Sequence, residues 1–287
     1  MEHNEPAAQA REMPPLLGST SLSALTAFFL VWPFLGFALS RILRRNDVAD
    51  LLWGTGIAAL AWLVALPHWG ELTRAQLFLL TLVSMWGLRL TAHLAVRNLP
   101  RPEDQRYVDM RNRWGRTEPL NAYLRVFLLQ SALAIFVALA AWWKLRAPLG
   151  LGDPLTWIDQ GAVALAVIGL GVETSADFTL LSHMNRAHPK PPVLRSGLWA
   201  WSRHPNYFGE TVFWWGVSLV GIRSGLDLLG LLGALLITWL LLRVSGVPLL
   251  DARTRTRGPE HQAYLAEVSG FIPMPPSLWR KIRSQTK

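Results

Sequence analysis

The sequence predicts an all-α integral membrane protein with seven transmembrane helices, its N-terminus outside and its C-terminus in the cytoplasm. Three observations predict this fold class. First, 51% of the 287 residues are hydrophobic and only 16% are charged, whereas soluble domains carry about 25% charged residues. Second, the apolar residues gather in stretches close to the roughly 20 residues needed to cross a bilayer. Third, the basic residues between these stretches are distributed unevenly.

The apolar stretches are separated by short polar loops, which leave no room for a large soluble domain. The seven expected spans lie at about 22–43, 48–68, 73–96, 120–143, 156–180, 206–222 and 226–250. We expect residues 1–20 to form a disordered tail, because their first part is polar and lacks the basic-to-apolar transition of a signal peptide. Spans one to four occupy residues 21–150, and spans five to seven with their loops occupy residues 151–287.

The basic residues set the expected orientation. When loops are assigned alternately to two sides, 21 of the 28 Lys and Arg residues fall on one side and five on the other. Such an asymmetry marks the cytoplasmic side. We therefore attribute most of the net charge of +9 to topology and to binding anionic membrane lipids, and expect no nucleic acid partner.

The chain has no cysteine, which excludes disulfides, thiolate metal sites, iron–sulfur clusters and a cysteine nucleophile. No metal site is expected, and redox chemistry would need a dissociable cofactor. Arginine outnumbers lysine 24 to 4, a bias typical of a bacterium rich in G and C. We expect a monomer in the bacterial inner membrane.

Ionisable residues inside the predicted spans are costly and usually mark function. Arg89 and His93 are four residues apart and share a helix face, as do Glu173 and Asp177. Two carboxylates on one face repel each other unless a cation or a polar ligand lies beside them. The ionisable residues at membrane depth are Asp50, Arg89, His93, Glu173, Asp177 and Glu210. Together they predict a polar cavity toward the cytoplasmic side.

The densest motif is SGLWAWSRHPNYFGETVFWWG, at residues 196–216. Pro205 and Asn206 predict a helix start, with Asn206 as the cap, Arg203 and His204 just outside and Glu210 one turn inside. A helix N-terminus beside basic side chains binds phosphate groups. No GxGxxG or Walker-type loop is present, so any nucleotide would bind in a helical, membrane-embedded pocket.

At this motif the chain resembles the membrane-bound steroid 5-alpha-reductase family, and more narrowly its bacterial branch. The resemblance rests on SRHPNYFGE followed by WWG and extends over about residues 45–275. Its other motifs are WGLRLTAHLAVRN, RPEDQRY and RNRWG within 86–115, GVETSADF at 171–178, and VSGVPLL with AYLAEVSGFIP within 244–273.

The resemblance implies a seven-helix fold that encloses NADPH from the cytoplasmic side. It implies hydride transfer to the β-carbon of an enone lipid, such as the C4–C5 double bond of a 3-keto-Δ4 steroid. By position, Glu173 and Asp177 would contact the nicotinamide and ribose. The remaining cofactor residues would be Asn206, Tyr207 and Glu210 along the cofactor, and Arg195, Arg203 and His204 at its phosphates. Arg253, in an arginine run, is a further expected partner of the 2′-phosphate.

The proton donor is the open point of this comparison. Eukaryotic members polarise the ketone with a Glu in span two and a Tyr in span three. This sequence offers Asp50, with Trp53 nearby, in span two, and Arg89 and His93 but no tyrosine in span three. Because charge develops on the enolate oxygen, we expect His93 or a protonated Asp50 to donate there.

Two other readings stay open. A lipid or prenylcysteine-type methyltransferase that uses S-adenosylmethionine carries a string similar to RHPNY, but it does not need the Glu173 and Asp177 pair. A non-enzymatic membrane carrier or scaffold needs neither the RHPNY string nor the acidic pair. The paired acids and the ionisable groups in spans two and three favour the reductase.

Overall fold

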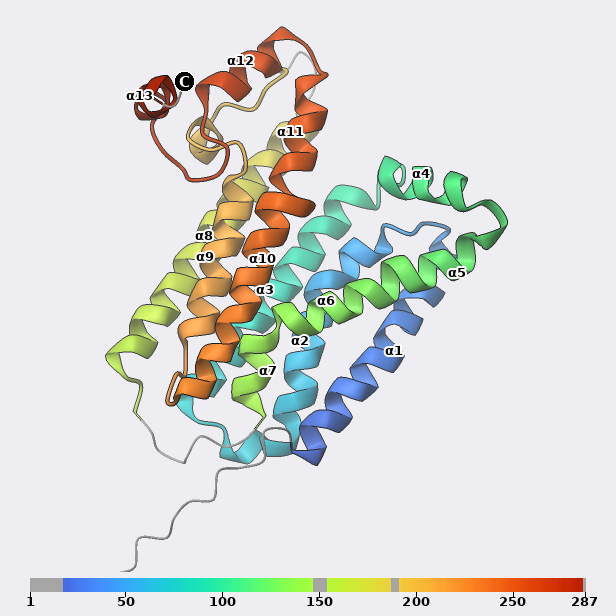
Figure 1. Cartoon of the computed structure of the whole chain (residues 1–287), viewed down its shortest axis with the longest axis vertical. Helices are drawn as coiled ribbons and strands as arrows, with labels where there is room; N and C mark the ends of the chain where they lie inside the picture. The colour runs from blue at the N-terminus through green and yellow to red at the C-terminus, as the bar shows by residue number, and fades with distance from the viewer. Residues whose placement is uncertain (1–17, 147–153, 187–190, 286–287) are drawn as a thin grey trace, which may run out of the picture.

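The computed structural model describes residues 18–146, 154–186 and 191–285, so the tail expected at 1–20 lies almost wholly outside it. Over the described ranges the chain is helical, and no β-strand is present there apart from an isolated bridge between Ser202 and Ser269. Figure 1 shows an elongated bundle in which the first turn of α1 and the C-terminal helix α13 lie at opposite ends.

The first three helices form a hairpin series. They are α1 Ser19–Leu43, α2 Val48–Ala65 with the 3-10 turn η1 Leu66–Glu71, and α3 Arg74–Asn98. Thr73 and Gln76 cap the start of α3 reciprocally. Gly54 and Gly87 face each other where α2 crosses α3, and a Cβ on either would collide with the carbonyl group of the other.

The polar stretch 97–118, between two of the expected spans, contains the short helix α4 Gln105–Trp114. The span expected at 120–143 is not one regular helix, because a π-helical turn and a break at Ala138 divide it. The turn η2 Gly115–Thr117 precedes it, and its parts are α5 Glu118–Ala122, η3 Tyr123–Leu128, α6 Leu129–Val137 and α7 Leu139–Leu145.

The second half begins with α8 Trp157–Asn185, against which α9 Pro205–Leu219 packs along its length. The approach is close because glycines line it: a Cβ on Gly209 would lie 2.5 Å from the backbone nitrogen of Glu173. The other elements are η4 Gly197–Ala200, η5 Gly225–Gly230, α10 Leu231–Trp239, η6 Leu240–Val244, α11 Val247–Arg255, α12 Pro259–Glu267 and α13 Pro276–Gln285.

Among the described residues, six helical stretches are long and apolar enough to cross a membrane. The chain is therefore a multi-pass membrane protein by length and composition. The stretch expected at 206–222 is not among the six, because α9 has only 15 residues. The six are Ser19–Leu43, Val48–Glu71, Arg74–Asn98, Gln105–Val137, Trp157–Asn185 and Gly225–Arg255. The seven-span count and the orientation stay predictions.

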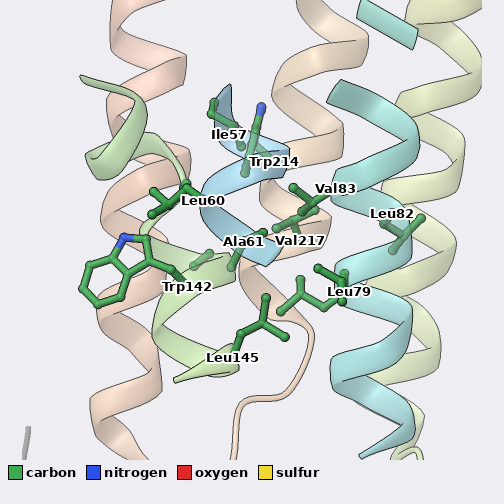
Figure 2. Packing of buried hydrophobic residues seen from close by; sticks show 14 of the residues in the cluster. Ile57, Leu60, Ala61, Leu79, Leu82, Val83, Trp142, Leu145, Trp214 and Val217 are labelled. Atoms are coloured by element: carbon green, nitrogen blue, oxygen red, sulfur yellow. The ribbon is translucent and has the colours of Figure 1, made fainter. Parts of the chain in front are cut away.

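The hydrophobic core fills one end of the bundle. Figure 2 shows side chains of α2, α3, α7 and α9 converging there, among them Leu60, Leu79, Leu145 and Val217. Trp86, Phe213 and Trp214 add an aromatic cluster with ring centroids 5.0–5.6 Å apart. The other end of the bundle, where α2 begins and α3 ends, is hollow.

Candidate functional site

Two adjoining cavities occupy the hollow end of the bundle. The inner cavity, of about 580 Å³, lies among α2, α3, α4, α6, α8, α9 and α10. The outer cavity, of about 530 Å³, lies among α8, α9, α11 and α12. Both volumes are within the range of about 300–1,000 Å³ typical of small-molecule sites. The residues that line both are Arg97, Arg106, Asn206, Tyr207 and Ser245.

The acidic face predicted on α8 lies at the inner cavity. Glu173 and Asp177 both pair with Arg89 of α3, and the Arg89 Nη1 to Asp177 Oδ2 distance is 2.7 Å. The Trp86 indole donates to Glu173 at 3.1 Å. The cation beside the two acids thus comes from α3, and it fixes α8 against α3.

Two further groups at this face have unused hydrogen-bonding capacity. Glu210 is only 8% exposed, lines the inner cavity and makes no hydrogen bond or ion pair among the described residues. His93 Nε2 is buried without a hydrogen-bond partner, 3.7 Å from Asp177 Oδ1. Three carboxyl groups therefore surround the single guanidinium of Arg89. A ligand with amide or hydroxyl donors would satisfy them.

Helix α9 begins at Pro205, as expected, but its side-chain contacts differ from the prediction. Asn206 does not cap the helix; its Nδ2 donates to Asp177 Oδ1 at 3.1 Å. Arg203 and His204 both turn to Asp251 of α11, at 2.6 and 3.0 Å. His204 also stacks on Tyr207, with ring centroids 5.6 Å apart. These contacts order the start of α9, where the two cavities meet.

Asp50 lies across the inner cavity in a cluster that the sequence did not reveal. The Tyr107 hydroxyl of α4 donates to Asp50 Oδ1 at 2.6 Å, and Arg106 Nη2 donates to Oδ2 at 2.9 Å. Gln130 Nε2 of α6 is 3.3 Å from the same Oδ1. Trp53 lines the cavity one turn along α2. The motif RPEDQRY contains both Tyr107 and Arg106, and was the signal available.

The position of α4 is set by a polar network at its start. Asp104 Oδ1 accepts from the Arg106 backbone at 2.8 Å and from Arg106 Nε at 3.1 Å. Burial would raise the pKa of Asp104, but the bonds from Arg106 outweigh it and hold this pKa below its ordinary value. Asp47, paired with Arg45 at 2.6 Å, accepts from the Asp104 backbone at 3.1 Å. Asp104 therefore stays ionised at neutral pH and keeps Arg106 over Asp50.

The outer cavity is basic. Arg253 lines it, with Nη2 3.6 Å from Asp104 Oδ1. Tyr264, whose pKa is raised by burial, closes one wall and donates to the Trp199 carbonyl at 2.7 Å. The basic residues along the walls are Arg97, Arg106, His183, Arg203, His204, Arg253, Arg257 and His261.

Arg195 is the one expected cofactor residue that lies in neither cavity. It pairs with Glu267 at 2.6 Å and lies over the Tyr264 ring at 5.2 Å. Asp50, Trp53, His93, Glu173, Asp177 and Glu210 line the inner cavity, Arg203, His204 and Arg253 line the outer one, and Asn206 and Tyr207 line both. Arg89 lines neither cavity and contacts the site through its ion pairs with Glu173 and Asp177.

Comparison with known proteins identifies the family. No match was found among curated proteins or among solved structures. A family model, described as Protein of unknown function (DUF1295), matches residues 36–268. This region contains both cavities and all of the expected site residues. The chain therefore belongs to the DUF1295 family, which is related to the steroid 5-alpha-reductases.

Proposed function

We propose that this protein is a membrane-embedded reductase that uses NADPH to reduce the carbon–carbon double bond of an enone lipid. The C4–C5 bond of a 3-keto-Δ4 steroid is the type substrate. The observation that supports this most directly is one cavity with two separate polar groups. A hydroxyl–carboxyl pair, Tyr107 and Asp50, lies on α4 and α2. An acidic cradle, formed by Glu173 and Asp177 of α8 and Glu210 of α9, lies on the other side.

The cradle fits the amide and ribose end of NADPH. Glu210 has both carboxyl oxygens without a partner among the described residues, and Asn206 joins Asp177 at the point shared by the two cavities. The outer cavity carries guanidinium groups, which match phosphates in a bidentate manner. Arg253 is the expected partner of a 2′-phosphate, since its side chain is 39% exposed and its one ion pair among the described residues is a long contact to Asp104, at 3.6 Å. When bound, NADPH would supply the hydride.

The residues of α2 and α4 would handle the negative charge that develops on the ketone oxygen of the lipid. The Tyr107 hydroxyl donates to Asp50 in this structure, and it would turn to the ketone oxygen when the lipid binds, while Arg106 keeps Asp50 in place. A preorganised donor at a developing oxyanion is worth about 10²–10³ in rate. The β-carbon gains the hydride, and the enolate then takes up at its α-carbon a proton that comes from the solvent. Tyr107, on α4, would take the role that the eukaryotic members give to a tyrosine in span three.

The rest of the inner cavity suits a lipid. Its apolar walls exclude water and strengthen the electrostatic effect of the few polar groups. They are formed by Trp53, Leu90, Leu94, Met110, Leu133, Ile237 and Leu241. This lining favours a rigid apolar substrate with one polar oxygen, reached from the bilayer.

The test uses the purified chain in lipid nanodiscs. NADPH oxidation is followed with progesterone or testosterone, and the product is identified by mass spectrometry as the substrate plus two hydrogens. In parallel, the protein is given S-adenosylmethionine with a radiolabelled methyl group and lipid acceptors. Reduction without methyl transfer supports the proposal. Methyl transfer without reduction would replace it with the methyltransferase reading.

A further inference from the structure

A third hollow, of about 410 Å³, lies outside the cavities described above, among α11, α12 and α13. We refer to it as the C-terminal hollow. Trp279, Arg255 and Gln262 line it and line neither cavity, whereas Arg203 and Asp251 lie between it and the outer cavity. Figure 1 shows α12 and α13 side by side at this end of the molecule.

Two buried N–H groups at the hollow have no acceptor among the described residues. They are Nε of Arg203 and the indole Nε1 of Trp279. The rest of the Arg203 guanidinium is engaged: Nη1 donates to the carbonyls of Leu265 and Val268 at 2.6 and 3.0 Å, and Nη2 to Asp251 at 2.6 Å. Buried donors without acceptors are rare in folded proteins, because leaving them unpaired costs free energy.

The charge at the hollow is positive. Arg203 and Arg255 contribute guanidinium groups, and Asp251 is the one carboxylate among the lining residues. Both Asp251 oxygens are already occupied, Oδ2 by Arg203 and Oδ1 by His204. The hollow therefore combines positive charge with two lining residues whose buried donors have no acceptor among the described residues, and both features match the oxygens of a phosphate group.

Helix α13 adds a feature of the same surface. Leu278 and Ile282 are four residues apart, so they share a face, and they are 48% and 40% exposed. Arg280 and Lys281 stand exposed on the same short helix. A basic amphipathic helix of this kind lies at a lipid surface, which would bring phospholipid headgroups to the hollow.

We propose that the C-terminal hollow binds a phosphate-type anion, with Arg203 Nε, Trp279 Nε1 and Arg255 as its donors. The anion is either inorganic phosphate or the phosphodiester of an anionic phospholipid. The site adjoins the outer cavity, with which it shares Arg203 and Asp251, but it does not depend on the function proposed above.

The test measures binding without any nucleotide. Radiolabelled inorganic phosphate is titrated by equilibrium dialysis at constant ionic strength, and phosphatidylglycerol adducts are counted by native mass spectrometry in a neutral detergent. Trp279→Phe keeps an aromatic ring but removes the indole N–H, and Arg255→Gln removes the exposed charge. The controls are Trp157→Phe, on an 82% exposed tryptophan, and Arg280→Gln, which lies on α13 outside the hollow.

We expect saturable binding of one anion per protein. Its affinity should fall about tenfold in Trp279→Phe and in Arg255→Gln, as for loss of one hydrogen bond to a charged group. In the controls the affinity should fall less than twofold. Arg253→Gln separates this site from phosphate bound in the outer cavity, and should leave it unchanged. Saturable binding of phosphate alone or of lipid alone supports the site and identifies the source. No saturable binding, or binding that Trp279→Phe and Arg255→Gln leave intact, overturns it.

Discussion

The Tyr107 hydroxyl and Asp50 Oδ1 are 2.6 Å apart, although the two residues lie on different helices, 57 positions apart in the chain. Arg106, next to Tyr107, holds the other oxygen of Asp50. A carboxylate fixed by a guanidinium and accepting from a phenol orients that phenol within the inner cavity. This pair is the best candidate for the donor that the proposed reaction requires.

Replacing Tyr107 with Phe should lower turnover about 10²–10³-fold, the usual cost of one oxyanion donor. NADPH affinity should change less than twofold, because Tyr107 contacts Asp50 rather than the acidic residues proposed to hold NADPH, and it does not line the outer cavity. Single-turnover reduction of a radiolabelled enone, beside a fluorescence titration with NADPH, measures the two separately. Tyr123→Phe is the control, since Tyr123 lines neither cavity. A full rate in Tyr107→Phe, with loss of rate in His93→Ala, would assign the donor to α3 instead.

Removing the amide of Asn206 or the charge of Glu210 should weaken NADPH binding about tenfold or more, because Asn206 holds Asp177 where the two cavities meet and Glu210 lines the inner cavity without a partner among the described residues. Asn206→Ala, Glu210→Gln and Asp177→Asn are titrated with NADPH and NADH in detergent. Glu260→Gln, at the start of α12 outside both cavities, serves as the control. Wild-type affinity in all three variants would place the cofactor elsewhere.

Arg89→Gln should destabilise the protein by about 3–5 kcal/mol, because it leaves buried carboxylates without their counter-ion. Glu173, Asp177 and Glu210 would then face one another. The double variant Arg89→Gln with Glu173→Gln removes one of these charges and should recover part of the loss. Thermal unfolding in detergent measures both. A single variant as stable as the wild type would show that the acids are neutralised by protons rather than by Arg89.

Gly209→Ala should cost about 1–3 kcal/mol, as for overpacking of a close interface. Its Cβ would press on the Glu173 backbone and move α9 away from α8, so NADPH affinity should fall too. Gly171→Ala is the matched control, because a Cβ there meets nothing within 4 Å. Equal melting temperatures for the two variants would mean that α9 can move away from α8 without loss of stability, contrary to this prediction.

The orientation can be tested directly because the chain has no cysteine. Glu71→Cys in η1 and Lys281→Cys in α13 place single thiols on exposed residues at opposite ends. We expect a membrane-impermeant maleimide to label Glu71→Cys from the outside, and Lys281→Cys only after the membrane is opened. Labelling in the opposite order would reverse the topology.

The sequence predicted the long helices well, because a bilayer demands unbroken apolar runs. It could not predict the division of residues 118–145 into short pieces, since hydropathy does not report a π-helical turn or the break at Ala138. The length of α9 was overestimated for a similar reason: Val220 and Gly221 are apolar or small, but the chain leaves the helix after Leu219.

Site residues that act through helix spacing were found, such as Glu173 with Asp177. Those that depend on long-range contacts were not. Tyr107 lies in a polar loop, so periodicity gave no reason to place it against Asp50. Asp251 looked like an ordinary residue of a basic tail, yet it engages both Arg203 and His204. Tertiary contacts of this kind leave no local signal.

The apolar walls of the inner cavity have a kinetic consequence if its ligand arrives from the bilayer. The enzyme would then respond to the mole fraction of substrate among the lipids, and bulk molarity would be a poor measure of it. Adding inert lipid at a fixed total amount of steroid would dilute the substrate in two dimensions and slow the reaction, while the apparent affinity for the water-soluble cofactor stayed constant. Saturation curves for the two ligands would thus need different concentration scales.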